Sequence, residues 1–205
     1  MHFKLTEEII ALSVSKFWEQ AKLEWNFDYL YVAEEVQTCL CGHYPIRNIC
    51  VITNHKNDER TQVGNCCVNK FLGIENGNKI LDAIKRLKAD PEKSMGADVL
   101  EYLMQKQVIS DWDYEFYTDT IRKRVLSTKQ LEHRERINQK LIDFTSGETA
   151  TMMSKIDRIL KWSEDQEDFD TGFVDSVKRS CQRNGKLTTN QEKALDKIIL
   201  GFKIK

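Results

Sequence analysis

The stretch Cys39-Leu40-Cys41-Gly42-His43, with Gly64-Asn65-Cys66-Cys67 further along the chain, decides how we interpret this sequence. Five of the six cysteines in the 205 residues fall between positions 39 and 67. A glycine directly after Cys41 lets the backbone turn back, so that two thiols form a tight knuckle. A second pair at the start of a predicted helix lies near the positive end of the helix dipole, which favours thiolates. Four thiolates converging on one point are typical of a structural zinc site.

We therefore predict one structural Zn²⁺ ion held by Cys39, Cys41, Cys66 and Cys67. The spacing departs from the usual pairs of Cys-x₂-Cys, because two adjacent cysteines must splay apart to reach one ion. His43, Cys50 and His55 are alternatives for the fourth ligand, with His43 foremost. The competing interpretation is a group of buried free thiols in a small apolar core. A catalytic cysteine is disfavoured because no Cys-x-x-Cys occurs and no base with a third orienting group is evident.

Around the cysteines, the sequence predicts a small α+β module. Helical spacing of apolar residues after Thr6 predicts a first amphipathic helix of about five turns, reaching Trp25. A strand is predicted over 29–36, and a β-hairpin is formed by 46–53 and 61–63 around a polar turn. Residues 66–72 then form a short helix that Gly73 ends.

The rest of the chain is predicted to be helical. Apolar stripes over 80–87 and 99–104 are separated by Pro91 and Gly96, residues that commonly mark helix boundaries. Further helices are expected at about 111–123, 128–143, 150–163, 170–183 and 189–202. The predicted fold class is mainly α with a small zinc-binding module of knuckle, β-hairpin and helix. We expect two regions, residues 1–73 with the N-terminal helix and zinc module, and residues 74–205 with the helices.

An internal repeat is predicted in the helical region. A shift of sixty-one positions aligns Ser127-x-x-Gln130 with Thr188-x-x-Gln191, and both are capping-box spacings. The repeated unit is therefore an αα-hairpin, spanning about 111–143 in the first copy and 170–203 in the second. Chance similarity between helical sequences is the alternative.

The cysteine segment also carries a resemblance. The run from Cys39-Leu-Cys41-Gly-His43 through Val63-Gly64-Asn-Cys66-Cys67-Val68-Asn-Lys70-Phe71 resembles a pattern in many uncharacterised proteins of phages, bacteria and large DNA viruses. The resemblance implies a zinc-binding module similar to treble-clef zinc fingers and an origin in a virus or mobile element. In that pattern the position of Cys66 is the variable one, and no activity is implied.

Charge alternates along the chain although the total is only −1. Segments 120–140 and 176–205 carry +5 and +6, against −5 for 98–119 and −6 for 141–175. The basic segments surround the two hairpin turns, where clustered cations favour contact with phosphates. The candidate nucleic-acid contacts are Arg122, Lys123, Arg124, Lys129, Arg183 and Lys186, with Tyr114, Phe116 and Tyr117 as candidate stacking partners for bases. The alternative is that acidic and basic helices neutralise one another.

The predicted function is that of a non-enzymatic zinc-binding protein that contacts nucleic acid through its basic hairpins. The alternative is an adaptor or inhibitor that binds a host or viral protein, with the zinc site purely structural. No apolar run reaches the length of a membrane span, and no secretory signal begins the chain. We therefore expect a soluble protein of the cytoplasm, or of the host cytoplasm if the chain is viral. No motif for a small-molecule substrate is evident.

Overall fold

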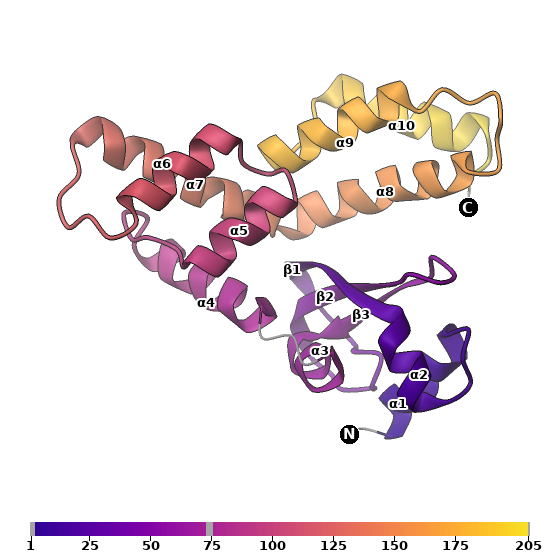
Figure 1. The fold of residues 1–205 in the computed structure, drawn as a ribbon. Helices are drawn as coiled ribbons and strands as arrows, with labels where there is room; N and C mark the ends of the chain where they lie inside the picture. The colour runs from indigo at the N-terminus through magenta and orange to yellow at the C-terminus, as the bar shows by residue number, and fades with distance from the viewer. Residues whose placement is uncertain (1–2, 73–75, 205) are drawn as a thin grey trace. The chain divides into compact units, whose positions relative to one another are not determined.

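The computed structural model describes residues 3–72 and 76–204 (Figure 1). It divides the chain into two compact units, residues 1–85 and 86–205. The division falls within helix α4 (Asn76–Ala89), whereas the boundary predicted from the sequence lies at 73–74. Gly73, the predicted end of the short helix, lies outside the described residues. The described parts confirm a mainly α fold with a small α+β region, since helices dominate and the strands form one small antiparallel sheet.

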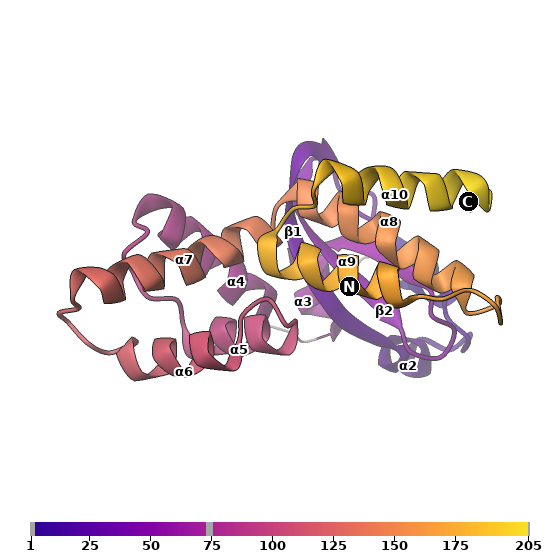
Figure 2. The same ribbon diagram turned by 90° about the horizontal axis from the view of Figure 1, so that it is seen from above.

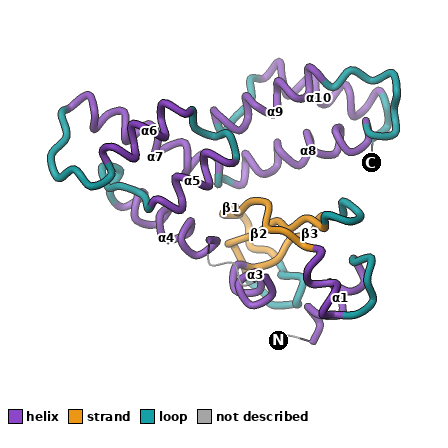
Figure 3. Tube along the Cα trace, in the orientation of Figure 1, coloured by secondary structure: helices purple, strands orange, loops and turns teal. Residues whose placement is uncertain are grey.

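The sheet belongs to the first unit and consists of β1 (Trp25–Gln37), β2 (Ile46–Asn54) and β3 (Arg60–Gly64) (Figure 3). The strands are antiparallel in the order β1-β2-β3, so β2 is the central strand and pairs with both of the others. Its β-branched run is buried, and Cys50 lies opposite Leu30 on one side and Val63 on the other. The predicted hairpin is therefore confirmed.

The predicted N-terminal helix through Trp25 is wrong. The chain forms α1 (Phe3–Leu12), bends, and then forms the short α2 (Trp18–Ala21) and a 3₁₀ turn η1 (Lys22–Glu24) before β1 begins. The cause is the buried Glu24, whose carboxylate accepts hydrogen bonds from the backbone N–H groups of Val14 and Ser15, both at 2.9 Å. These donors are thereby removed from a continuous helix.

Glu24 also ties the bend to the sheet. Its carboxylate accepts a third hydrogen bond, from the Asn54 side chain at 2.9 Å. Burial on its own would raise the pKa of Glu24, but the bonds from Asn54, Ser15 and Val14 and the charge of Lys56 lower it to about 2. The carboxylate is thus ionised and fully used in holding the first unit together.

In the second unit the predicted helices are confirmed, with ends shifted by a few residues. They are α5 (Ala97–Gln105), α6 (Asp111–Thr120), α7 (Thr128–Phe144), α8 (Gly147–Ser163), α9 (Gly172–Asn184) and α10 (Thr189–Gly201). Both predicted capping boxes form, with Ser127 and Gln130 at the start of α7 and Thr188 and Gln191 at the start of α10. No helix among the described residues has the length and apolar character needed to span a membrane.

The helices of the two hairpins begin at positions that differ by sixty-one residues, as predicted. At equivalent positions, however, the first hairpin buries charged side chains and the second buries apolar ones. Asp113 and Arg134 are buried in the first hairpin, whereas the equivalent Val174 and Leu195 are buried in the second. The second hairpin shares an apolar core with α8, and α8, α9 and α10 lie together in both views (Figures 1 and 2).

The polar core of the first hairpin fastens the segment between α4 and α5. The Tyr117 hydroxyl accepts a hydrogen bond from the Met95 N–H at 2.8 Å and donates to the Asn138 side chain at 2.6 Å. The Asn138 amide donates to the carbonyls of Pro91 and Lys93 at 2.7 and 2.8 Å. The buried polar groups of this network therefore satisfy one another.

Candidate metal centre

The predicted knuckle forms between β1 and β2. The Cys39 N–H donates to the His43 carbonyl at 2.9 Å, and the Gly42 N–H donates to the Cys39 carbonyl at 2.7 Å. Gly42 has a φ of +86°, a conformation that residues with a Cβ rarely adopt. The knuckle thus depends on this glycine, as the sequence indicates.

The third sulfur comes from helix α3 (Asn65–Leu72), which follows β3 without a loop. Helix α3 packs on all three strands, and its Val68 side chain is fully buried. This orientation places Cys67, in the first turn, toward the knuckle. The Gly64 N–H, at the junction of β3 and α3, donates to the Cys39 sulfur at 3.2 Å. Backbone donors and the helix dipole therefore both favour negative charge at this point.

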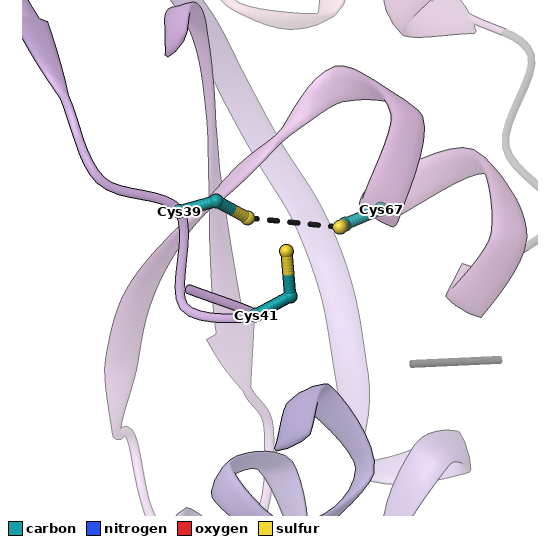
Figure 4. A group of neighbouring side chains, drawn as sticks. All are labelled: Cys39, Cys41 and Cys67. Atoms are coloured by element: carbon teal, nitrogen blue, oxygen red, sulfur yellow. Dashed lines mark hydrogen bonds between the residues drawn. The ribbon is translucent and has the colours of Figure 1, made fainter. Parts of the chain in front are cut away.

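The sulfur atoms of Cys39, Cys41 and Cys67 all lie within 4.8 Å of one another (Figure 4). The sulfurs of Cys39 and Cys67 are 3.6 Å apart. In a tetrahedral zinc site with Zn–S bonds of about 2.3 Å, two ligand sulfurs lie about 3.8 Å apart. The three side chains are therefore placed as they must be to hold one metal ion between them.

The acid–base properties of the cluster favour a bound cation. The hydrogen bond with Cys67 is the main cause that lowers the pKa of Cys39 to about 5, with further help from the N–H groups of Gly64 and Cys41 and against the effect of burial. The same contact with Cys39, together with burial, raises the pKa of Cys67. The two sulfurs are joined by a hydrogen bond, which contains one thiol proton. A metal ion would displace that proton, because cysteine binds metals as the thiolate.

Cys66 is not part of the cluster. Its side chain is exposed, whereas Cys39 and Cys41 are buried and Cys67 is half-buried. Adjacent residues on an α-helix point about 100° apart, so the two sulfurs cannot approach the knuckle equally, and Cys67 is the one that reaches the other two. The structure therefore brings together three of the four sulfurs that the sequence assigns to the ion.

None of the three alternative ligands, Cys50, His55 and His43, belongs to the group of close sulfurs. Cys50 is buried in the central strand, and burial raises the pKa of its thiol to about 12. His55 is exposed in the turn between β2 and β3. His43 is exposed at the end of the knuckle, and its side chain lines a pocket that the three sulfurs also line.

This pocket has a volume of about 410 Å³ and lies within the first unit. Its charged side chains are Arg47 and Lys70, and no Asp or Glu is among the described residues that line it. Neither cation is among the site residues predicted from the sequence. Lys70 could have been found, because it lies three positions after Cys67 on the same helix and hence on the same face.

The predicted nucleic-acid contacts form two separate groups in the second unit. Arg122, Lys123, Arg124 and Lys129 are exposed around the start of α7, and Arg183 and Lys186 are exposed at the turn between α9 and α10. Gly185 in that second turn lies against Asp143, near the other end of α7. At a rise of 1.5 Å per residue, the two turns are separated by about 25 Å along α7. They are not brought together into one patch.

Of the candidate stacking residues, Tyr117 is fully buried and Arg134 lies over its ring at 5.7 Å. Phe116 packs against Trp112 and His133. Tyr114 is partly exposed. Tyr117 is therefore unavailable for stacking on a base.

The chain was compared with known proteins at three levels. No family model, no curated protein and no solved structure matches it.

Proposed function

We propose that the first unit is a zinc-binding module in which Cys39, Cys41 and Cys67 hold one Zn²⁺ ion. The observation that carries this proposal is the convergence of the three sulfurs, from the knuckle and from α3, to within 4.8 Å. Thiolate ligands favour Zn²⁺, Cu⁺ and iron–sulfur clusters over harder cations, and a single ion at tetrahedral sulfur separations favours Zn²⁺.

The proposed role of the ion is structural and non-enzymatic. The knuckle lies between β1 and β2, and α3 follows β3, so the ion would join segments that are distant in sequence. Such a link adds most to the folding stability of a small module, because the apolar core of the module is itself limited.

Removing the metal with a strong chelator should loosen the first unit selectively. We expect faster amide hydrogen exchange in residues 39–72, because the knuckle and α3 lose their common ligand. The helices α8–α10 should keep their protection, since their apolar core contains none of the three ligands. Hydrogen exchange followed by mass spectrometry measures both regions in one experiment. Recovery with Zn²⁺ but not Mg²⁺ is the control, and unchanged exchange in 39–72 would contradict the proposal.

A second candidate function is contact with nucleic acid through the connection between α6 and α7. What supports it is the exposure of Arg122, Lys123, Arg124 and Lys129 within and beside this connection. Four cations on one exposed segment suit the phosphate backbone, whose recognition is electrostatic and independent of sequence. The alternative is a protein partner with a complementary acidic surface.

Replacing Arg122, Lys123 and Arg124 together by glutamine should weaken binding to single-stranded DNA and flatten its salt dependence. The slope of log K against log salt should fall by about 0.7 for each phosphate contact that is lost. Fluorescence anisotropy at several salt concentrations measures this slope. The matched control is the double replacement of Lys193 and Lys197, which are exposed on α10. No binding at low salt, or equal slopes for all variants, would favour the protein partner.

A further inference from the structure

The pocket beside the three sulfurs has the size of a ligand site. Its volume of about 410 Å³ lies within the range of about 300–1,000 Å³ that is usual for small-molecule pockets. The sulfur-bearing residues Cys39, Cys41 and Cys67 all line it, so an ion held by the three sulfurs would border the pocket.

The described part of the chain supplies three close ligands and not four. The group of ligand atoms lying within 4.8 Å of one another contains Cys39, Cys41 and Cys67. His43 and Cys66 line the pocket, but both are exposed and outside that group. A zinc ion with three protein ligands keeps one position for water or another exchangeable ligand.

The charges around the pocket select the kind of ligand. One Zn²⁺ ion with three thiolates has a net charge of about −1, which would repel an anion unless cations lie nearby. Lys70 and Arg47 line the pocket, and the Arg47 guanidinium is fixed by donating to the carbonyls of Ala33 and Glu34. The Lys4 ammonium lies beside Gly42, 3.3 Å from where a Cβ of that residue would be. Two lining cations, with Lys4 beside the knuckle, thus accompany a pocket that has no Asp or Glu among its described lining residues.

We propose that the fourth coordination position of the ion opens into this pocket and takes a small anionic ligand from solution. The inference rests on the proposed zinc site and adds a binding activity to it. The ligand coordinates the metal through one donor atom, and Lys70 and Arg47 stabilise its negative charge. The three protein thiolates still fasten the knuckle to α3, so the structural role and the binding role are compatible.

Cobalt substitution tests this proposal on the full chain. Co²⁺ replaces Zn²⁺ in thiolate sites, and its visible spectrum reports both sulfur ligation and the number and type of ligands. We expect the Co²⁺-loaded chain to show thiolate-to-cobalt bands. Titration with azide, a monodentate anion, should shift the ligand-field bands in a saturable manner. Imidazole, a neutral monodentate ligand, should bind more weakly than azide.

Two sets of variants separate the open site from a closed one. Cys66→Ser and His43→Ala should leave the ligand-field bands unchanged, because neither side chain is a ligand in the proposed site. Lys70→Gln should weaken azide binding about two- to fivefold, the effect of one accessible charge pair. Lys16→Gln, a lysine of the first unit that does not line the pocket, should leave azide binding unchanged.

The outcomes distinguish the two proposals. Absence of thiolate-to-cobalt bands would overturn the zinc site itself. Thiolate bands that azide does not alter would overturn only the open position. A change of the ligand-field bands in His43→Ala or Cys66→Ser would also overturn it, and would identify that residue as the fourth ligand.

Discussion

Replacing Cys67 by serine is expected to lower the metal content of the purified chain from about one ion to nearly none. The change removes one of three converging sulfurs and keeps the size of the side chain almost constant. Two remaining thiolates from the knuckle alone cannot join it to α3, so the chelate and its link to the helix are lost together. Because binding of a structural zinc ion contributes about 10 kcal/mol or more in small zinc domains, we expect the first unit to lose most of its metal-dependent stability. Metal analysis and thermal unfolding measure the two effects.

Cys66→Ser is the matched control, because Cys66 is the adjacent residue on the same helix and its side chain is exposed. We expect this variant to keep its metal and its unfolding temperature. In excess chelator, Cys67→Ser and the unaltered chain should unfold alike, since the serine then removes nothing that the metal supplied. Metal retention by Cys67→Ser, or loss of metal from Cys66→Ser, would contradict the assignment of the ligands.

Replacing Gly185 by alanine should strongly destabilise the second unit. Gly185 ends α9 with a φ of +65°, and a Cβ there would lie 2.4 Å from the Cβ of Asp143 and 3.1 Å from its backbone carbonyl carbon. The buried Thr149 hydroxyl also donates to the Gly185 carbonyl, so the backbone there is held on two sides. Alanine would be strained in the left-handed backbone conformation, and its Cβ would overlap with Asp143. Together these two effects should lower the free energy of unfolding by about 2–5 kcal/mol. Urea unfolding measures the difference.

Gly201→Ala is the control for this prediction. Gly201 lies in the last turn of α10, and a Cβ there would meet nothing within 4 Å. Alanine has the higher helix propensity, so this variant should be neutral or more stable by up to about 1 kcal/mol. Equal effects of the two substitutions would show that the junction of α7, α8 and α9 is not as tightly packed as described.

Helix starts and hairpins were predictable from the sequence because their causes are local. The capping boxes at Ser127 and Thr188 involve residues three positions apart, and they form as predicted. The N-terminal helix was mispredicted because its bend has a distant cause. Apolar spacing alone favours a continuous helix, but Glu24 accepts hydrogen bonds from the N–H groups of Val14 and Ser15 and also from the side chain of Asn54 in β2.

The metal centre was partly predictable for the same reason. The knuckle of Cys39 and Cys41 depends on the local turn at Gly42, which the sequence shows. The choice between Cys66 and Cys67 depends on how α3 is rotated against the sheet, and that rotation is fixed by the burial of Val68. The pocket could not be predicted at all, since its lining joins Leu5, the knuckle, the start of β2 and α3.

The basic turns show the limit of reasoning from a repeat. Both hairpin turns carry exposed cations, but the packing of α9 against α7 and α8 determines where the second turn lies. Gly185 places the second turn at the far end of α7 from Arg124. The two basic groups must therefore be tested separately.

The central claim is that three sulfurs from separate segments hold one metal ion, and the metal content of the freshly purified chain tests it most directly. Elemental analysis by inductively coupled plasma mass spectrometry, after purification without chelators, should find about one zinc ion per chain. A chain that is folded by circular dichroism yet contains no zinc, and takes up none when it is supplied, would contradict the account.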